Sequence, residues 1–498
     1  MIEHIRPQVL LVAGLDSGGG AGITADTISV HDNFAFALPA VTALTAQSLK
    51  SITKVTPTDE DTFRETLRLV CQDFNNIRAI KVGLISDDRL LEILLEYLDT
   101  SLKDIPLVWD PVLCGTAGDL HSVDLKKYLE RILPHVTIFT PNLPEAMTLA
   151  SWDREMLEKQ GVTELGQYFL KQGAKTVVIK GGHNISTLDA EDTFVSEKRT
   201  FKLRTRRIKG EGAHGGGCAL SSSLAALLAC GFAPHDAAVL AKAYIYKGIN
   251  SPAIPDNENR PPIGHHGFID DLSCYPEVTE SHFPEKSAAF PACPEKLGLY
   301  PVVDSFAWVK RLVDLGVRTI QLRIKDKDRP NLEEEIFKSA DYCREKHARL
   351  FIDDYYELAI KAHSYGVHLG MEDLLTADLK AIHASGLRLG VSTHGPFELI
   401  KAIQLNPSYI ALGHIFETRS KVMESKPQGV FKLTLEQQLV KNRFPTVAIG
   451  GIKLANVKEV LSSGAGSVAL ITGITQAEDP DADTLKWLSL CGSGGDEE

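Results

Sequence analysis

The chain has 498 residues, more than one hydrophobic core usually serves, so two or three domains are expected. Its net charge of -12 disfavours non-specific binding to nucleic acid or to an acidic membrane. No apolar run is long enough to cross a bilayer, Asp16 comes too early for a signal peptide, and eight scattered cysteines without a CxxC pair predict reduced thiols. We therefore expect a cytoplasmic globular protein that holds anionic ligands in local sites.

The first half of the chain alternates short apolar runs with helix-like stretches. This βα rhythm is typical of a mostly parallel sheet covered by helices, that is, of an α/β domain. The runs are, in chain order, VLLVAG, AVTALTA, AIKVGLI, PLVWDPV, VTIFTPN and TVVIKGG.

A glycine-rich segment, residues 14–22, follows the first run and precedes a predicted helix. Its backbone N–H groups could approach a ligand closely. It lacks the Lys-Ser/Thr ending of a P-loop and does not fit the dinucleotide spacing, so a tight turn and a binding loop are equally good interpretations.

Polar residues follow three later runs. Asn142 and Glu145, three residues apart, could share a metal-water network around phosphates, or could cap a helix, and the two roles are compatible. Asp110 is a candidate for the Mg²⁺ shell, and Lys180 could meet phosphate. Each of these last two could also be a solvated strand terminus.

The strongest pattern in this half is GEGAHGGGC, residues 210–218, which runs directly into an Ala/Leu/Ser-rich helical segment. Consecutive glycines at a helix start leave N–H groups free at the positive end of the helix dipole, which is an anion hole for a transferring phosphoryl group. Cys218 lies where that field favours a thiolate. The alternative is a small buried cysteine that packs the helix start.

These segments together resemble hydroxymethylpyrimidine/phosphomethylpyrimidine kinases, which have a ribokinase-like fold and act in thiamine biosynthesis. The resemblance spans nearly all of residues 8–270 and is carried by VAGLDSGGGAGITAD, TALTAQS, IKVGL, WDPV, TPNLPEA, VIKGGH and HGGGCALSSSLAA. It implies that MgATP phosphorylates 4-amino-5-hydroxymethyl-2-methylpyrimidine and then its monophosphate, chiefly through positioning and charge neutralisation.

The same resemblance implies roles for individual residues. It places Cys218 as catalytic base in the anion hole, together with Gly215, Gly217 and Lys180. Asp26 and Gln47 would bind the aminopyrimidine, and the nucleotide and Mg²⁺ would be held by Asn142, Glu145, Lys180 and Asp110. The chain departs from the family pattern at Leu15, Thr24 and Gly216, where the family usually has Ser, Gln, and Thr or Ser.

A proline-rich stretch separates the two halves. Eight of the 24 prolines lie between Pro252 and Pro294, where no helical or strand period persists. We therefore expect a kinase domain at residues 1–270, an extended linker at 271–295 and a second domain at 296–498.

Eight β-like runs follow one another in the second half, and eight is the number that closes a (β/α)8 (TIM) barrel. They are LYPVVD, TIQLRI, RLFIDD, GVHLG, RLGVST, YIALGH, TVAIGG and SVALIT. Polar residues gather at their C-terminal ends, where barrel enzymes place their chemistry.

In the segment QLRIK, which overlaps the second of these runs, Gln321, Arg323 and Lys325 alternate and are expected on one strand face. Two cations inside a closed barrel require an anionic ligand. Asp354 and Asp373 follow the third and fourth runs, close enough to share a hard cation, which predicts a Mg²⁺-diphosphate site.

The last runs end in the usual barrel phosphate position, at Gly450-Gly451 and at Thr472-Gly473. A second phosphate ligand is predicted there. The loop Thr418-Arg419-Ser420-Lys421 adds hydroxyls and a cation, although a flexible polar loop would have the same composition.

This half, about residues 297–475, resembles thiamine phosphate synthase through QLRIKD, GVHLGMEDL, GVSTH, ETRSK and VAIGGI. That family joins the pyrimidine diphosphate to thiazole phosphate and releases pyrophosphate. The resemblance implies that Asp354 and Asp373 hold Mg²⁺. It implies substrate contacts by Gln321, Arg323, Lys325, Asp353, Ser392, Thr418, Ser420, Lys421, Gly451, Ile471 and Thr472.

Two positions depart from this family's pattern. Asp353 replaces the usual Asn, and Tyr355 replaces the usual Arg or another polar residue, which predicts weaker diphosphate binding or a greater dependence on Mg²⁺.

The expected cofactors of the whole chain are Mg²⁺ and ATP as co-substrate. The expected partners are small phosphorylated molecules, with no nucleic acid and no membrane, and a homo-oligomer is compatible with the sequence. The alternatives are a ribokinase-family kinase for another hydroxymethyl substrate and a ligand-sensing protein with a decayed barrel.

Overall fold

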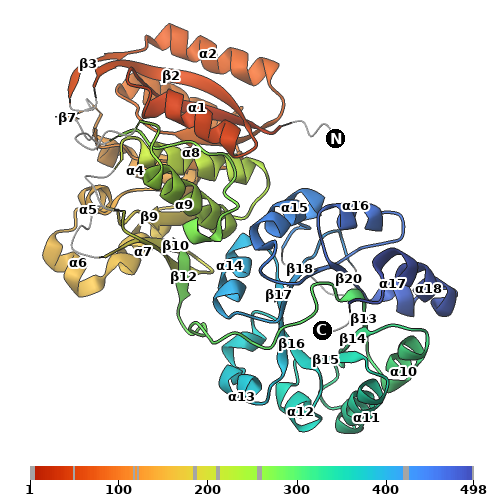
Figure 1. Ribbon diagram of the computed structural model, residues 1–498. Coiled ribbons are helices and arrows are strands. Elements are labelled where there is room, and N and C mark those ends of the chain that lie inside the picture. Colours follow the sequence, from red (N-terminus) through yellow and green to blue (C-terminus); the bar gives the residue numbers. More distant parts are fainter. Residues whose placement is uncertain are drawn as a thin grey trace. The chain divides into compact units, whose positions relative to one another are not determined.

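The structure, a computed structural model, describes residues 6–48, 51–115, 118–119, 123–182, 188–208, 213–254, 261–418 and 425–495, with only the backbone at 114–115 and 118–119. The chain divides into two compact units, Met1–Ser281 and His282–Glu498, which are described separately (Figure 1).

Ten strands form one sheet in the described part of the first unit, in the order β12-β11-β10-β9-β8-β5-β4-β1-β2-β3. The six predicted runs are β1, β2, β4, β5, β8 and β9, and they pair in parallel. The sequence did not reveal the antiparallel strands β3 and β10 to β12 at the two ends. The strands are β1 (Gln8–Asp16), β2 (Phe36–Gln47), β3 (Ile52–Pro57), β4 (Ile77–Val82), β5 (Leu107–Trp109), β8 (Val136–Phe139), β9 (Thr176–Ile179), β10 (Asp189–Ser196), β11 (Thr200–Arg206) and β12 (Glu277–Glu280), with β6 (Cys114–Gly115) and β7 (Gly118–Asp119) as a separate pair.

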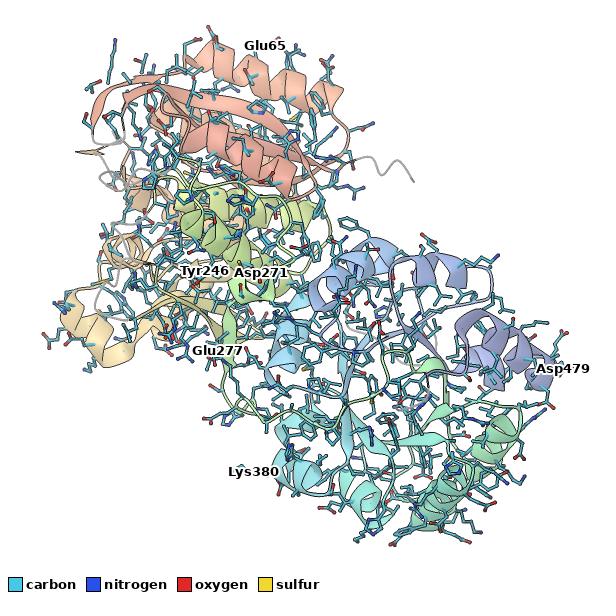
Figure 2. All side chains as sticks on the ribbon, in the orientation of Figure 1. Glu65, Tyr246, Asp271, Glu277, Lys380 and Asp479 are labelled. Atoms are coloured by element: carbon cyan, nitrogen blue, oxygen red, sulfur yellow. The ribbon has the colours of Figure 1, made fainter. Side chains whose placement is uncertain are left out.

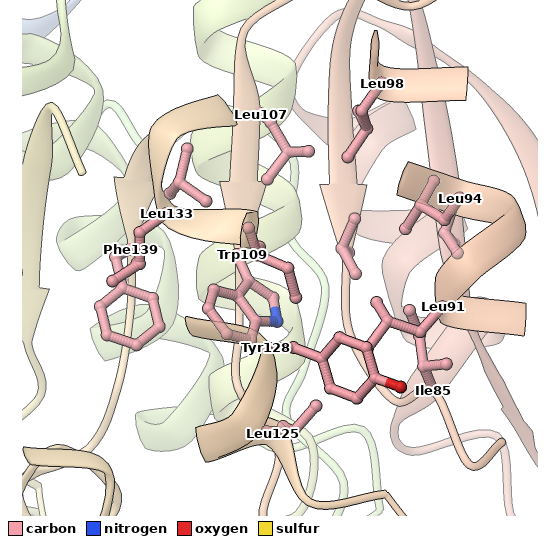
Figure 3. Packing of buried hydrophobic residues seen from close by; sticks show 14 of the residues in the cluster. Ile85, Leu91, Leu94, Leu98, Leu107, Trp109, Leu125, Tyr128, Leu133 and Phe139 are labelled. Carbon is pink, nitrogen blue, oxygen red and sulfur yellow. The ribbon is translucent and has the colours of Figure 1, made fainter. Parts of the chain in front are cut away.

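Helices cover both faces of this sheet. They are α1 (Gly22–Asp32), α2 (Glu60–Asp73), α3 (Asp88–Asp99), α4 (Leu125–Ile132), α5 (Leu143–Ala150), α6 (Arg154–Gln160), α7 (Val162–Lys171), α8 (Gly216–Ala229) and α9 (Pro234–Asn250), with short 3-10 turns η1 (Leu133–His135) and η2 (Leu272–Cys274). On one face, α2, α3, α4, α5 and α7 bury a continuous apolar cluster against the strands. Figure 3 shows its centre, where Trp109 and Phe139 pack at 4.9 Å between ring centroids.

The opposite face of the sheet carries α1 and α8, and α9 packs on α8. Strand alternation sends Ile80 and Val82 into the apolar cluster and turns Lys81, between them, toward α1 and α8. Because α8 lies between the sheet and other helices, residues from Ala219 to Leu227 are all buried, which explains its small side chains.

In the described residues of the second unit, eight parallel strands close into a barrel in sequence order, as predicted (Figure 1). They are β13 (Gly298–Val303), β14 (Thr319–Leu322), β15 (Arg349–Asp353), β16 (Gly366–Leu369), β17 (Arg388–Thr393), β18 (Tyr409–Leu412), β19 (Thr446–Ile449) and β20 (Ser467–Leu470). The helices outside are α10 (Phe306–Asp314), α11 (Leu332–Glu345), α12 (Tyr356–Lys361), α13 (Leu379–Ala384), α14 (Pro396–Gln404), α15 (Gly429–Val440), α16 (Val457–Ser462), α17 (Thr472–Thr475) and α18 (Pro480–Cys491), with η3 (Asp373–Leu375). The fold class expected for both halves is thus confirmed.

The proline-rich segment 271–295 is shared between the units. Its first part contributes β12 to the sheet, next to β11. Its second part lies on the barrel, where the Ser287 hydroxyl donates to the Leu405 carbonyl and the Arg388 guanidinium donates to the Ala292 carbonyl.

Charged side chains line the outside of both units. Glu65, Lys380 and Asp479 are exposed and extend from the outer helices or their ends (Figure 2). Among the described residues, no helix combines the length and the apolar character that a membrane crossing requires.

Candidate active sites

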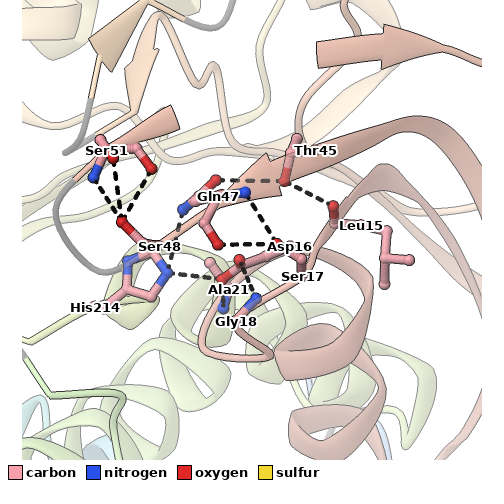
Figure 4. Close-up of polar contacts among 10 residues, drawn as sticks. All are labelled: Leu15, Asp16, Ser17, Gly18, Ala21, Thr45, Gln47, Ser48, Ser51 and His214. Atoms are coloured by element: carbon pink, nitrogen blue, oxygen red, sulfur yellow. Dashed lines mark hydrogen bonds and ion pairs between the residues drawn. The ribbon is translucent and has the colours of Figure 1, made fainter. Parts of the chain in front are cut away.

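The glycine-rich loop after β1 is folded around the Asp16 carboxylate (Figure 4). That carboxylate accepts hydrogen bonds from the Gly18 and Ala21 amides at 2.8 and 2.9 Å, and it contacts His214 Nε2 at 2.7 Å. Burial alone would raise the pKa of Asp16, but these hydrogen bonds, chiefly that of His214, hold it below its usual value. The loop is therefore an ordered turn held by hydrogen bonds to the ionised Asp16 carboxylate.

His214 joins this loop to the second glycine-rich segment. Its Nε2 also lies 3.4 Å from Gln47 Nε2, and the Gln47 backbone N–H donates to the Ser17 hydroxyl oxygen at 2.9 Å (Figure 4). Gln47, a predicted pyrimidine contact, is thus beside both glycine loops. The network of Asp16 and His214 was not predicted, because 198 positions separate its members.

The start of α8 lies against the first glycine loop. Gly215 has φ 83°, in the left-handed region, and a Cβ there would overlap the Gly20 carbonyl oxygen. Among the described residues, no side chain caps α8, so the first amides of this helix keep their hydrogen-bonding capacity for a ligand.

A buried ion pair lies at this helix start. Lys180 Nζ donates to Asp110 Oδ1 at 2.7 Å, and a Cβ on Gly217 would lie 3.2 Å from Lys180 Nζ and 3.6 Å from Asp110 Oδ2. The structure thus brings Gly215, Gly217, Lys180 and Asp110 together, although they come from three different segments.

Asn142 and Glu145 form the predicted capping box of α5. The Glu145 amide donates to Asn142 Oδ1 at 2.8 Å, and the Asn142 amide donates to Glu145 Oε2 at 2.7 Å. Burial raises the pKa of Glu145, and Lys180 opposes this while Asp110 adds to it. The helix-capping interpretation is confirmed, and the carboxylates of Glu145 and Asp110 feel each other's charge, an arrangement that suits a divalent cation.

Cys218 occupies the first turn of α8, but the prediction of a thiolate there is wrong. Burial raises the pKa of the Cys218 thiol to about 11; Lys81 lowers it, and the negative charges of Asp26 and Asp110 raise it further. The thiol is therefore protonated at neutral pH. Desolvation outweighs the field of the helix dipole at this position.

Asp26, the other predicted pyrimidine contact, has no exposed surface. Its carboxylate pairs with Lys81 Nζ at 2.6 Å and accepts from the Ser222 hydroxyl at 2.7 Å. A substrate could reach Asp26 only if these neighbours moved. Lys81 was missed because one lysine within an apolar run gives no local signal of its partner.

In the barrel, Gln321 and Arg323 both contact Asp353 at the end of β15. Arg323 Nε donates to Asp353 Oδ2 at 2.8 Å, and Gln321 Nε2 donates to the other carboxylate oxygen. Burial, followed by the charge of Asp354, raises the pKa of Asp353 to about 7, while Arg323 lowers it. The expectation of one strand face through Lys325 is corrected, because β14 ends at Leu322 and Lys325 is exposed beyond it.

Asp354 and Asp373 meet, as expected, after the adjacent strands β15 and β16. Burial and the neighbouring Asp373 carboxylate raise the pKa of Asp354. Within the described residues, no group of three or more His, Cys, Asp or Glu side chains forms a metal site. Two carboxylates nevertheless suit Mg²⁺, which keeps several waters and takes further ligands from substrate phosphates.

Ser392 lies at the end of β17, where its hydroxyl is 2.7 Å from His368 Nε2. His368 is buried and neutral, because burial and the charge of Arg323 lower its pKa to about 3. This histidine was not among the predicted residues. The motif GVHLG contains it, and strand alternation from Gly366 would have placed it inward.

The predicted thiazole phosphate site lies after β18 to β20. A Cβ on Gly451 would overlap the Glu417 carbonyl oxygen and Phe416. Ile471 is half-buried, and Thr472, which begins α17, is exposed. Thr418 is described, but Ser420 and Lys421 lie outside the described residues.

These two units define an enzyme that handles small phosphorylated molecules. The first is an α/β sandwich with a glycine-flanked helix start beside a lysine, and the second is a barrel with an arginine and paired carboxylates at the carboxyl ends of its strands.

Comparison with known proteins gives the particular families. A family model described as phosphomethylpyrimidine kinase matches residues 16–262, and one described as thiamine monophosphate synthase matches residues 299–474. The thiamine-phosphate synthase of Klebsiella pneumoniae is 53% identical over 205 residues, which cover 41% of this chain and 97% of that relative. That of Salmonella dublin is 54% identical with the same coverage. A solved phosphomethylpyrimidine kinase from Clostridium difficile is 28% identical, covers 48% of this chain and 98% of its own, and has a TM-score of 0.42.

The chain belongs to the thiamine-phosphate synthase family and carries, ahead of that barrel, a domain of the phosphomethylpyrimidine kinase family. Both domains are enzymes of thiamine biosynthesis, as the sequence motifs predicted.

Proposed function

We propose that the first unit phosphorylates hydroxymethylpyrimidine and then its monophosphate with MgATP, and that the second joins the resulting diphosphate to thiazole phosphate and releases pyrophosphate. One observation carries this proposal: each unit gathers basic side chains and carboxylates where its parallel strands end. Phosphoryl and diphosphate chemistry needs this combination to neutralise charge.

In the kinase unit, the amides that open α8 and the Lys180 ammonium would bind the oxygens of the transferring phosphoryl group. Asp110, Asn142 and Glu145 would hold Mg²⁺, whose charge would offset that of the nucleotide phosphates. Gln47 would orient the aminopyrimidine. Cys218 would face the substrate hydroxyl, with its proton on sulfur while the site is free of ligand.

In the synthase unit, Asp354 and Asp373 would hold Mg²⁺, which would supply positive charge to the diphosphate. Arg323, Lys325 and Lys421 would add cationic contacts. Gln321 and Ser392 would hold the pyrimidine or its leaving group, and the residues around Gly451 and Thr472 would bind the thiazole phosphate. Asp353 would weaken diphosphate binding, because its carboxylate pairs with the Arg323 guanidinium and offsets the positive charge that the diphosphate needs.

The test is one incubation of the pure chain with hydroxymethylpyrimidine, thiazole phosphate and MgATP, followed by chromatography. Thiamine phosphate is the expected product. Omission of the thiazole should leave pyrimidine diphosphate to accumulate, and absence of both products would refute the proposal.

Two variants separate the half-reactions. Lys180→Met should stop formation of the diphosphate but still convert supplied diphosphate, whereas Asp373→Asn should accumulate the diphosphate and form no thiamine phosphate. Lys171→Met and Asp341→Asn, which alter exposed residues on α7 and α11, are the matched controls. Equal loss of both reactions in either active-site variant would contradict the assignment of one reaction to each unit.

A further inference from the structure

Four hydrogen-bonding side chains form a row across the interior of the barrel. The Tyr300 hydroxyl lies 2.8 Å from the Tyr409 hydroxyl, Tyr409 lies 2.6 Å from His368 Nδ1, and His368 Nε2 lies 2.7 Å from the Ser392 hydroxyl. The four residues come from β13, β18, β16 and β17. We refer to them as the interior row.

One end of the interior row is closed. Tyr300 and Tyr409 are 1% and 0% exposed, and they pack in an apolar cluster with Leu297, Val302 and Phe351. Among the described residues, the Tyr300 hydroxyl has one hydrogen-bond partner, the Tyr409 hydroxyl. The Cys293 thiol also packs against this cluster, but sulfur is a weak acceptor.

The other end of the row is open. Ser392 is partly exposed and lies at the carboxyl end of its strand, the end at which barrel enzymes bind ligands. The positive charge of Arg323 acts on His368, the neighbour of Ser392 in the row.

Each of the four groups carries one mobile proton, because the two tyrosines are phenols and the imidazole, buried with two hydroxyl partners, is neutral. Three hydrogen bonds join four groups, so the row has two possible directions. If protons point toward Tyr300, its own proton ends unpaired in the apolar cluster. If they point toward Ser392, the last proton reaches the open end. A buried donor without a partner costs free energy, so the first direction should be less populated than the second by about tenfold or more.

We propose that the interior row fixes Ser392 as a hydrogen-bond donor, with Tyr300 donating to Tyr409, Tyr409 to His368 Nδ1, and His368 Nε2–H to the Ser392 oxygen. The hydroxyl proton of Ser392 then points at the ligand. The barrel therefore selects, at this point, a ligand atom that offers a lone pair, such as a diphosphate oxygen or an unprotonated ring nitrogen. This inference rests on the proposed contact of Ser392 with substrate. Tyr300, Tyr409 and His368 are positioning residues.

The geometry also shows how the sequence makes room for the row. A Cβ on Gly390 of β17 would overlap the ring of Tyr409, and a Cβ on Gly366 of β16 would meet Phe351. Both glycines thus permit large aromatic rings inside a small barrel.

The test is ¹⁵N spectroscopy of the full chain labelled at its histidine rings, with the His368 signals assigned by their loss in His368→Gln. We expect the proton on Nε2 and an unprotonated Nδ1. In Tyr409→Phe the two shifts should move toward each other as the two tautomers mix. A proton on Nδ1 in the native chain, or an unchanged tautomer ratio in Tyr409→Phe, would overturn the proposal.

Kinetics provide a second readout. We expect Ser392→Ala to raise the KM for the pyrimidine diphosphate about 10-fold to 100-fold, since it removes a donor to a charged or polar acceptor. Tyr409→Phe should raise it by a few-fold, and Tyr342→Phe, which alters a half-buried phenol on α11 outside the barrel interior, should not change it. A Tyr409→Phe enzyme with native KM would overturn the proposal. The native tautomer is read without turnover, so an inactive barrel with the proton on Nε2 would refute the proposed function and leave the direction of the row intact.

Discussion

The buried pair of Asp26 and Lys81 gives the sharpest stability prediction. Both side chains have no exposed surface, and the Lys81 ammonium lies 2.6 Å from the carboxylate. Lys81→Met keeps most of the volume of the side chain and removes its charge. Asp26 would then be a carboxylate in the protein interior without a cation, with the Ser222 hydroxyl as its remaining donor.

The cost of Lys81→Met has an upper limit, because Asp26 can bind a proton instead of staying charged. Burial already raises the pKa of Asp26 above its ordinary value of 3.8, and loss of Lys81 raises it further. Protonating the group at pH 7 costs about 1.4 kcal/mol for each pH unit above 3.8, which gives about 4 kcal/mol. This agrees with the range of about 3–5 kcal/mol measured when one partner of a buried pair is removed.

The sign of the pH effect follows from proton counts. In Lys81→Met the folded chain binds a proton at Asp26 that the unfolded chain lacks, so stability falls as pH rises. The destabilisation should shrink by about 1.4 kcal/mol per unit as pH is lowered toward 4. The double variant Lys81→Met/Asp26→Leu should recover most of the loss, because it leaves no buried charge.

Hydrogen exchange followed by mass spectrometry measures this effect within the intact chain. Peptides from β4 and α8 should lose about 4 kcal/mol of protection at pH 7, and barrel peptides serve as the internal control. A loss that is the same at pH 5 and pH 7, or a double variant no more stable than Lys81→Met, would refute the reasoning.

Three further outcomes are expected. Asp353→Asn should lower the Mg²⁺ concentration that half-saturates synthase activity by about threefold to tenfold, because it removes a negative charge beside the diphosphate site. This change corresponds to about 0.7–1.4 kcal/mol of binding free energy. Superimposable Mg²⁺ titrations of the two enzymes would contradict this prediction. Cys218 should react with iodoacetamide at pH 7.5 at least about 100-fold more slowly in the folded chain than in the urea-unfolded chain, because its pKa of about 11 leaves little thiolate. Peptide mapping measures both rates, and equal rates would show that Cys218 is a reactive thiolate. Gly390→Ala should destabilise the barrel by about 1–3 kcal/mol, because its methyl group overlaps the Tyr409 ring. A native melting temperature with unchanged His368 ¹⁵N shifts would contradict this, because it would show that the methyl group fits without displacing the ring.

Much of the fold could be predicted from local patterns. Each of the eight β-like runs of the second half became a barrel strand, because a strand buried on both faces is a short apolar run whatever its partners are. The meeting of Asp354 with Asp373 could be predicted for the same reason, since the carboxyl ends of adjacent parallel strands lie together. The antiparallel strands β10 to β12 were missed, because their mixed polar composition lacks that signal.

Charge states were harder to predict than positions. Cys218 was placed correctly at the start of α8, yet its thiol is protonated, because the penalty of burial exceeds the attraction of the helix dipole. Arg323 was placed correctly beside the barrel interior, yet Asp353 engages its guanidinium. Burial and neighbouring charge depend on the whole packed structure, so charge states cannot be predicted from a short segment of the sequence.

The sequence by itself determined the parallel strands of the two domains, the glycine loops and the kinds of residue that meet phosphate, because these follow from local periodicity and backbone freedom. Only the tertiary structure decided which of these residues touch. Asp16 with His214, Asp26 with Ser222 and Tyr300 with Tyr409 are separated by 198, 196 and 109 positions. Such contacts form because packing of the sheet, the helices and the barrel brings distant segments within hydrogen-bonding distance, and that packing is a property of the whole chain.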